Sequence, residues 1–247
     1  MILDFNKLEG FIFAAGLGTR LRPLTTTRPK ALVEVGGRKL IDIVIERLRE
    51  AGVRRVVVNV HHFAQQIIDH ISSSNYGVEV LISDEREYLL DTGGGLKKAY
   101  NEGLLSGTGA TIIHNVDILS QINLQKMVEY MKFTAVTATL AVSHRDTSRY
   151  LLFDDNDCLA GWHNTKSGEY RWVSNEQHLV RPLAYSGIAI LAPEFFSAMN
   201  DDREVFSIIE TYLAVAKCHR INFFEHSPDH WLDVCKPETL AEAIKYL

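Results

Sequence analysis

The sequence predicts an α/β fold in which a mostly parallel, mixed sheet is sandwiched between helices. Across the first half, short apolar runs alternate with amphipathic runs, which is typical of β-α-β units and of parallel strands. The chain has 247 residues, 46% hydrophobic and 23% charged, as in ordinary globular domains. Because no repeat, low-complexity tract or linker divides the sequence, we expect a single domain over 1–247 with two lobes, 1–134 and 135–247.

The alternation in the first half places strands and helices in turn. The segment 39–51 carries its apolar residues on one helical face, and Gly52 follows where a helix C-cap is typical. The segment 53–60 is rich in β-branched residues, which favour a buried strand. We expect strands at 10–15, 53–60, 78–83 and 110–117, and helices at 39–51, 63–73 and 93–102.

The second half is less regular. Its polar stretch at 154–178, rich in Asp, Asn, Gly and His, is interpreted as a hairpin and loops that cover one edge of the sheet. Pro237 begins the last amphipathic segment, at a position typical of a first helical turn. We expect strands at 135–143, 149–153, 183–191 and 219–225, and helices at 204–217 and 237–247.

Charge and composition exclude several classes of protein. The net charge of −5 argues against a protein that coats nucleic acid, whose phosphates favour a basic partner. We expect no signal peptide and no membrane helix, because the N-terminus is short and charged and no apolar run approaches the required length. Three widely spaced cysteines favour a reducing compartment, so we expect the protein in the cytoplasm.

The most informative segment is a glycine-rich, basic loop that follows the first expected strand. No acidic residue occurs between Glu9 and Glu34, although this interval contains four basic residues. The loop leaves the carboxyl end of the sheet, where open α/β sheets bind ligands. Gly16 and Gly18 allow a tight turn with N–H groups directed at an anion, and Arg20 can grip phosphate oxygens. The combination favours a polyphosphate ligand, and residues 14–37 are therefore called the phosphate loop.

Other interpretations of this loop are weaker. A solvated basic surface loop does not require glycines directly after a buried strand. The dinucleotide-binding fingerprint requires a third glycine where the sequence has Leu21, which disfavours a dinucleotide-dependent reductase. The P-loop string Gly-Lys-Ser/Thr is absent from the sequence.

The segment AAGLGTRLRPLTTTRPKALVEVGG, residues 14–37, resembles the signature of the sugar-1-phosphate nucleotidyltransferases, the nucleotide-sugar pyrophosphorylases. The resemblance extends over nearly the whole chain and implies a Rossmann-like, GT-A-like fold, with a nucleotide-binding lobe at 1–134 and a smaller sugar-binding lobe at 135–247. It implies that the loop wraps a nucleoside triphosphate, that Arg20 neutralises its phosphates and that Lys30 reaches the reacting phosphates. The implied nucleotide-binding residues here are Ala14, Ala15, Gly16, Gly18, Thr19 and Arg20.

Two carboxylates are candidate ligands of Mg²⁺, a hard cation that prefers oxygen and keeps several waters. Asp117 ends an expected strand on the same side as the phosphate loop, where the family has a metal-binding Asp. The resemblance also implies that Asp233 shares the metal. Val116 and Cys235 each stand where the family usually has glycine. If position 235 requires a positive φ, the cysteine there is strained.

Further binding residues are carried over from the resemblance. The segment containing Thr92, Gly93 and Gly94 corresponds to the family's turn over the nucleobase, although three glycines also fit a helix start that needs flexibility. The implied sugar-phosphate contacts are Lys30, Asn115, Tyr185 and Gly187. The family's Glu-Lys-Pro contact to the sugar phosphate is missing from this sequence, and Lys166 or Arg181 is the available substitute.

Two histidine patterns carry less weight. The residues His226, His230 and Asp233 resemble a two-histidine, one-carboxylate metal site, but Pro228 disfavours the helix that would align them. The pair at 61–62 lies at a strand-to-helix junction, where packing is the more ordinary role.

The resemblance implies that a sugar-1-phosphate and an NTP react to give an NDP-sugar and pyrophosphate. The attacking phosphate is already deprotonated at neutral pH, so the reaction needs no general base. The nearest resemblance is to N-acetylmuramate-1-phosphate uridylyltransferases, which implies UTP. Alternatives are GTP with mannose- or heptose-1-phosphate, and a catalytically silent sugar-nucleotide sensor. A silent relative is expected to lose Arg20, Lys30 or a carboxylate, and all four positions are intact.

Overall fold

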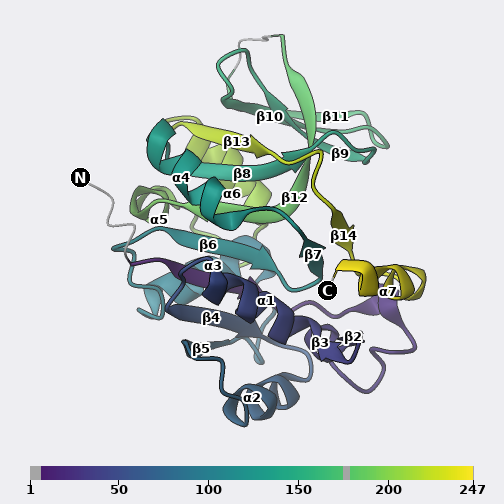
Figure 1. Cartoon of the computed structure of the whole chain (residues 1–247). Coiled ribbons are helices and arrows are strands. Elements are labelled where there is room, and N and C mark those ends of the chain that lie inside the picture. The colour runs from purple at the N-terminus through teal and green to yellow at the C-terminus, as the bar shows by residue number, and fades with distance from the viewer. Residues whose placement is uncertain (1–6, 175–178, 247) are drawn as a thin grey trace.

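The computed structural model describes residues 7–174 and 179–246. Within this part of the chain the main element is a mixed ten-stranded sheet, with the order β11-β10-β9-β12-β6-β1-β4-β5 and with β8 and β13 beside β12 (Figure 1). Its strands are β1 (Glu9–Phe13), β4 (Arg55–Val60), β5 (Glu79–Asp84), β6 (Thr111–Asn115), β8 (Ala138–Ser143), β9 (Arg149–Phe153), β10 (Leu159–Asn164), β11 (Glu169–Trp172), β12 (Arg181–Leu191) and β13 (Ile221–Glu225).

Two small ribbons and the helices complete the described structure. The ribbons pair β2 (Glu34–Val35) with β3 (Arg38–Lys39), and β7 (Ile118–Ser120) with β14 (Trp231–Asp233). The α-helices are α1 (Leu40–Glu50), α2 (Ala64–Ser72), α3 (Asp91–Asn101), α4 (Leu124–Thr134), α5 (Pro193–Ala198), α6 (Ile208–Ala216) and α7 (Pro237–Ala243). Short 3₁₀ helices are η1 (Thr19–Leu21), η2 (Lys30–Leu32) and η3 (Ile244–Tyr246).

The parallel strands create a crevice between β1 and β6. The strands β5, β4, β1 and β6 are parallel, and the chain moves outward from β1 to β4 and β5 before it returns to β6 on the other side of β1. The loops that follow β1 and β6 therefore diverge at the carboxyl ends of adjacent strands. Open α/β sheets bind ligands at such a switch point. The strands contributed by the second half pair mainly antiparallel, through β12.

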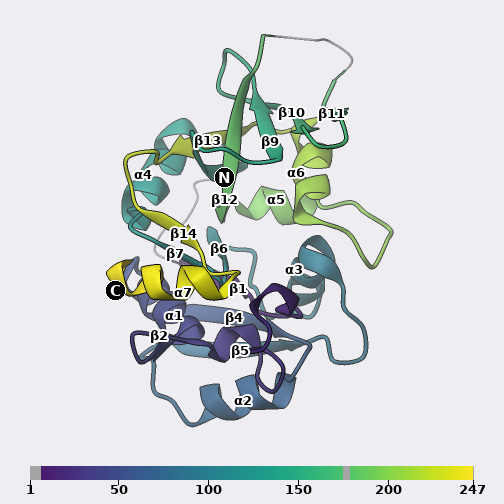
Figure 2. The ribbon, with the colours of Figure 1, turned by 90° about the vertical axis from the view of Figure 1, so that its right-hand side faces the viewer.

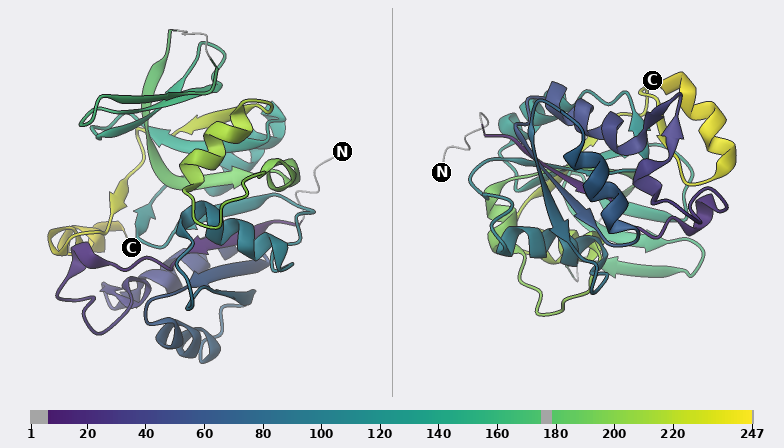
Figure 3. Two further views of the ribbon diagram at one scale, coloured as in Figure 1. Left: turned by 180° about the vertical axis from the view of Figure 1, so that it is seen from behind. Right: turned by 90° about the horizontal axis from the view of Figure 1, so that it is seen from below.

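Helices cover both faces of the sheet because successive strand residues point to opposite sides. Ile12 and Ile112 contribute to the core beneath α1, α2 and α4, whereas Phe11 and Ile113 contribute to the core beneath α3, α5 and α6. Helices α1 and α4 lie in front of the sheet in Figure 1, and α3, α5 and α6 come forward when it is seen from behind in Figure 3. The predicted fold class is confirmed.

Several element boundaries differ from the sequence expectations. Helix α6 begins at Ile208 rather than at 204, because the Ser207 side chain accepts the Ile209 N–H and caps the helix. The last α-helix stops at Ala243 and continues as η3. The expected hairpin within 154–178 is present as β10 and β11, with residues 175–178 outside the described part. Helices α4 and α5 and the β2–β3 and β7–β14 ribbons were not expected.

Among the described residues, no helix combines the length and apolar character needed to cross a bilayer.

Candidate active site

A cleft of about 410 Å³ opens at the switch point between β1 and β6. Figure 2 shows the purple segment after β1 on the same side of the sheet as the yellow helix α7, and Cys235, just before α7, lines the cleft. The residues that line the cleft are Phe13, Ala14, Gly16, Leu17, Gly18, Thr19, Arg20, Leu21, Lys30, Thr92, Asn115, Val116, Asp117 and Cys235.

The phosphate loop is folded back on its own signature residues. Gly18 has a φ of 63°, a left-handed conformation that favours glycine, and it precedes η1. The buried Thr25 hydroxyl donates to the Gly18 carbonyl at 2.7 Å. A Cβ at Gly18 would lie 3.1 Å from Thr25 Cγ2 and 3.2 Å from Lys30 Cβ. The loop is therefore tightly packed at Gly18, and residues 16–20 line the cleft.

Lys30 and Asp117 form an ion pair at the bottom of the cleft. The Lys30 ammonium donates to Asp117 Oδ2, and the two side chains are 10% and 19% exposed. Lys30 begins η2, and Asp117 follows β6 by two residues. Such low exposure strengthens the electrostatic attraction, because little water screens the pair.

Asp233 reaches the same place by strand pairing. In the ribbon of β7 and β14, Asp233 is opposite Ile118, and the Val234 N–H donates to the Asp117 carbonyl at 2.8 Å. Asp233 Oδ2 lies 3.9 Å from Nη1 of Arg20. Burial, followed by the nearby charge of Asp117, raises the pKa of Asp233, whereas Lys30 and Arg20 oppose this rise.

The two carboxylates fit a Mg²⁺ ion. Oδ1 of Asp233 is buried and has no hydrogen-bond partner, which is a cost unless another group satisfies it. Among residues 7–174 and 179–246, no cluster of three His, Cys, Asp or Glu side chains is placed to hold a metal. Mg²⁺ differs from zinc in that one or two carboxylates, waters and substrate phosphates commonly complete its shell. The paired aspartates match that requirement.

The two departures from the family's glycines are accommodated without backbone strain. Val116 is 4% exposed and packs into the core on one side of the sheet. The described non-glycine residues with positive φ are Phe63, Asp91, Ala135 and Asp157. Cys235 is not among them, so its backbone does not adopt the left-handed conformation that would strain a cysteine. Cys235 lines the cleft beside Asp233, and burial is the main cause that raises the pKa of its thiol.

The second glycine segment differs from the expected turn. Gly93 and Gly94 lie in the first turn of α3, and both N–H groups donate to the Phe206 carbonyl, at 2.8 and 3.2 Å. A Cβ at Gly94 would lie 2.0 Å from the Glu204 carbonyl oxygen. These glycines thus approach the chain's own backbone. Thr92 alone of the three carried-over residues lines the cleft, and contact of this segment with a nucleobase stays a prediction.

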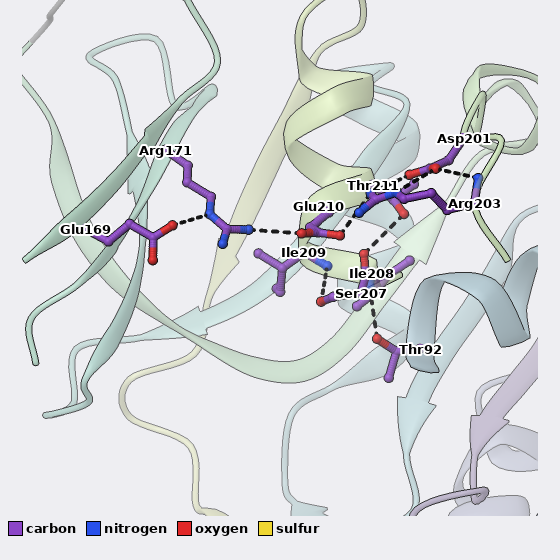
Figure 4. Close-up of polar contacts among 10 residues, drawn as sticks. All are labelled: Thr92, Glu169, Arg171, Asp201, Arg203, Ser207, Ile208, Ile209, Glu210 and Thr211. Carbon is purple, nitrogen blue, oxygen red and sulfur yellow. Dashed lines mark hydrogen bonds and ion pairs between the residues drawn. The ribbon is translucent and has the colours of Figure 1, made fainter. Parts of the chain in front are cut away.

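Thr92 also connects the cleft to the second half of the chain. Figure 4 shows its hydroxyl accepting the Ile208 N–H, at 2.9 Å, where α6 begins. Two residues further on, Glu210 accepts hydrogen bonds from Arg171 of β11 at 3.1 Å and from Arg203 at 3.0 Å. Helix α6 therefore links the outer hairpin to the helix that borders the cleft.

Of the four predicted sugar-phosphate contacts, Lys30 and Asn115 line the described cleft, whereas Tyr185 and Gly187 do not. Asn115 lines the cleft, and Gly187, with a φ of 75°, packs so closely that a Cβ would lie 2.8 Å from Asn115 Nδ2. The Tyr185 hydroxyl instead shares a hydrogen bond with the Tyr212 hydroxyl at 3.1 Å, and burial raises its pKa. Tyr185 and Gly187 do not line the cleft in the described structure, and their contact with a sugar phosphate stays a prediction.

The remaining candidates have other contacts. His226 is buried and shares a 2.7 Å hydrogen bond with Ser186. His61 Nδ1 lies 2.7 Å from the Glu85 carbonyl oxygen. Arg181 pairs with Asp157 in the turn between β9 and β10.

Lys166 is exposed in the β10–β11 turn, where its N–H donates to Asn164 Oδ1. Neither Lys166 nor Arg181 lines the cleft that the structure describes.

Sequence reasoning missed three polar residues that support the site. Asn59 accepts the N–H of Ala14, the first residue of the phosphate loop, at 2.7 Å. Glu85 accepts from Asn59 Nδ2 at 2.8 Å. Arg145 donates to the Tyr185 carbonyl at 2.5 Å and lies 3.9 Å from the ring centre of Trp231. The available signal was an asparagine inside the apolar run VVVNV, since a buried polar side chain requires partners.

The cleft brings the basic loop together with Asp117 and Asp233, an arrangement that suits a polyphosphate and a divalent cation. Residues 9–152 match the nucleotidyl transferase family, and the chain belongs to that family. It is 37% identical over 219 residues to an N-acetylmuramate alpha-1-phosphate uridylyltransferase of Caulobacter vibrioides, with 85% of each chain covered. It is 31% identical over 244 residues to the enzyme of that name from Neisseria meningitidis, with 96% of each covered.

The fold is also similar to a solved structure, HddC from Yersinia pseudotuberculosis complexed with GMP-PN. The TM-score is 0.73 at 22% identity, and the match covers 96% of this chain and 98% of that one. Together with the family match, these similarities identify the chain as a sugar-1-phosphate nucleotidyltransferase.

Proposed function

We propose that the protein transfers a uridylyl group from UTP to N-acetylmuramate-1-phosphate, giving the UDP-sugar and pyrophosphate. Support comes from the similarity of 37% and 31% to two uridylyltransferases that act on this sugar phosphate, over most of their lengths. The product class points to cell-wall sugar metabolism. The proposal makes the cleft at the switch point the site of both substrates.

The observation that carries the proposal is the convergence of four charged side chains from distant parts of the sequence. Lys30 pairs with Asp117, Asp233 lies beside Asp117, and Arg20 lies 3.9 Å from Asp233. Arg20, Lys30 and Asp117 line the cleft and Asp233 lies at its edge, next to the lining residue Cys235. Two cations and two acids placed together in this way suit a triphosphate and the divalent cation that accompanies it. In a purely structural role, these groups would pair fully with one another and leave no buried acceptor unsatisfied.

In the reaction that we propose, a phosphate oxygen of the sugar-1-phosphate attacks the α-phosphorus of UTP. The bond from the α-phosphorus to the bridging oxygen breaks, and pyrophosphate leaves with the electron pair. The nucleophile has a second pKa of about 6 and is ionised at neutral pH. Catalysis then requires in-line positioning of two anions and electrostatic stabilisation of the charge that develops on the phosphates.

Each residue of the candidate site has a proposed part in that reaction. The N–H groups after β1 and the Arg20 guanidinium hold the triphosphate, and Lys30 stabilises charge at the reacting phosphates. Asp117 and Asp233 would hold Mg²⁺, which when bound withdraws charge from phosphate oxygens. Thr92, with Gly93 and Gly94 behind it, is proposed to border the nucleobase. Asn115 is proposed to meet the sugar phosphate, with Tyr185 and Gly187 supporting that side.

A substrate panel tests the proposal. Pyrophosphate release is measured with each of the four NTPs against N-acetylmuramate-, mannose- and heptose-1-phosphate, in Mg²⁺. We expect the highest kcat/KM with UTP and N-acetylmuramate-1-phosphate. A higher kcat/KM with GTP and mannose- or heptose-1-phosphate would replace this substrate pair by the alternative. Sugar-nucleotide binding without any release of pyrophosphate would identify a sensor and overturn the catalytic assignment.

A further inference from the structure

Asn59 lies in a row of residues at the carboxyl ends of the parallel strands. It is opposite Phe13 of β1 on one side and Ser83 of β5 on the other, and it is 2% exposed. Its Oδ1 atom accepts the N–H groups of Ala14 at 2.7 Å and Ala15 at 3.3 Å. A side chain of β4 thus bonds to the first two residues of the phosphate loop as they leave β1.

Glu85 fixes the orientation of that amide. It follows β5 directly, is 2% exposed, and accepts from Asn59 Nδ2 through Oε1 at 2.8 Å. Because the amide nitrogen faces a carboxylate, the amide oxygen must face the loop. The second Glu85 oxygen accepts the N–H of Leu90, the residue before α3, at 3.4 Å. Burial raises the pKa of Glu85, and the hydrogen bond from Asn59 opposes that rise.

The first turn of α3 packs directly on this pair. A Cβ at Gly95 would lie 2.5 Å from Glu85 Oε1 and 2.9 Å from Asn59 Nδ2. Only a residue without a side chain lets the helix approach so closely. The same helix turn carries Thr92, which lines the cleft opposite the phosphate loop. A single buried hydrogen-bonded chain therefore joins the two glycine segments that border the cleft.

We propose that Asn59 and Glu85 are positioning residues that set the spacing between the phosphate loop and the first turn of α3, and thereby the affinity for the nucleoside triphosphate. This proposal rests on the proposed function of the cleft. Neither side chain lines the cleft, so both act through Ala14, Ala15 and the α3 turn. Misplacement of a binding group by about 1 Å is enough to lower activity by up to about 10²-fold.

The test is a reciprocal exchange of the hydrogen-bonding groups. In Asn59→Asp, the loop keeps its acceptor, but a second carboxylate faces Glu85 and repels it. In the double variant Asn59→Asp with Glu85→Gln, the new amide donates to the new carboxylate, which restores the chain with the two groups exchanged. The Kd of UTP with Mg²⁺ is measured by titration calorimetry at pH 8, and KM is measured for each substrate.

We expect Asn59→Asp to raise both the Kd and the KM for UTP about tenfold, with the KM for the sugar-1-phosphate within about twofold of the wild type. The double variant is expected to recover most of the loss. A UTP Kd within twofold of the wild type in Asn59→Asp overturns the proposal, as does a double variant no better than the single one. If Asn59→Asp does not fold, the double variant alone decides: near-wild-type UTP affinity supports the proposal, and a loss of affinity overturns it.

A matched control separates positioning from general destabilisation. Asn222 of β13 is also a buried asparagine, 3% exposed, with hydrogen bonds to Thr139 at 2.7 Å and Thr134 at 3.0 Å. Asn222→Asp is expected to change the melting temperature but to leave the Kd of UTP unchanged. Equal losses of UTP affinity in both asparagine variants overturn the proposal. A wild-type protein that binds UTP without releasing pyrophosphate overturns the proposed function and leaves the calorimetric test intact.

Discussion

Two glycine-rich segments border the cleft, and they use their glycines in opposite ways. At Gly16 in the phosphate loop, an added Cβ would meet no atom within 4 Å. At Gly94 in α3, it would meet the Glu204 carbonyl oxygen at 2.0 Å. The first segment is open toward a ligand, whereas the second is filled by the chain's own backbone. Similar composition therefore serves ligand approach in one place and helix packing in the other.

The contrast extends to hydrogen bonding. Gly93 and Gly94 already donate their N–H groups to Phe206, so these groups are not free for a nucleobase in this structure. Around the phosphate loop, buried side chains such as Thr25 and Asn59 hold the backbone from behind. The difference teaches that the loop is a binding element on a rigid support, and that the start of α3 is part of the support.

Within the comparison of the two segments, the largest expected effect comes from removing Lys30, the cation that the phosphate loop places in the cleft. Lys30→Ala is expected to lower kcat/KM for pyrophosphate release by about 10³-fold, because it removes a fixed charge from a poorly solvated site. Arg22→Ala is the control, since Arg22 is an exposed cation of the same loop that does not line the described cleft. Near-wild-type turnover by Lys30→Ala would show that the loop does not act on the reacting phosphates.

A substitution in the packed first turn of α3 is expected to lower the free energy of unfolding. Gly94→Ala places a methyl group against a backbone oxygen that cannot rotate away, so we expect a loss of about 2–3 kcal/mol in the free energy of unfolding. Urea denaturation measures this loss. An unchanged free energy of unfolding would mean that the contact with residues 204–206 does not constrain α3, and the contrast between the segments would disappear.

A substitution in the open phosphate loop is expected to weaken UTP binding rather than to change stability. Gly16→Ala should leave the free energy of unfolding unchanged or raise it by up to about 1 kcal/mol, because its φ is not in the left-handed region and its surroundings are open. Gly16 lines the cleft, so a methyl group there is expected to hinder the approach of a phosphate and to raise the KM for UTP about tenfold, equivalent to about 1.4 kcal/mol. A lower melting temperature with unchanged KM would reverse the assigned roles.

Mild acid is expected to lower the free energy of unfolding through two buried histidines of the sheet region. Burial lowers the pKa of His114 to about 3 and that of His226 to about 4. Both histidines are neutral in the folded protein at neutral pH. Between these lowered pKa values and the ordinary histidine pKa of about 6.5, the unfolded state binds more protons than the folded state. Stability therefore falls as pH decreases through this window, by about 1 kcal/mol from pH 7 to pH 6. Urea unfolding at both values checks this, and His114→Asn should have a smaller slope.

The parallel half of the fold was predictable because each element is long and has a clear period. Strands near 10–15 and 53–60 and the helix near 39–51 appear within a few residues of their expected bounds. The ribbon of β7 and β14 was not predictable, because three residues carry no detectable alternation. That ribbon nevertheless brings Asp233 to Asp117, a proximity that only the family resemblance anticipated.

Some residues of the candidate site could likewise be predicted from the sequence, and others could not. Residues of the phosphate loop and Lys30 could be predicted because glycines and basic residues are concentrated in one continuous segment. Asn59 and Glu85 could not, because their function depends on the alignment of β1, β4 and β5 across the sheet. Tyr185 is half-buried and shares a hydrogen bond with Tyr212 of α6, a long-range contact that no local pattern reveals.

The most direct test of the central claim is pyrophosphate release by Asp117→Asn, measured with UTP, N-acetylmuramate-1-phosphate and Mg²⁺ beside the wild type. The account predicts an active wild-type enzyme and a variant that folds normally by circular dichroism but is at least about 10³-fold slower. A folded variant with nearly wild-type release would contradict the assignment of Asp117, and with it the shared site of Lys30, Asp117 and Asp233.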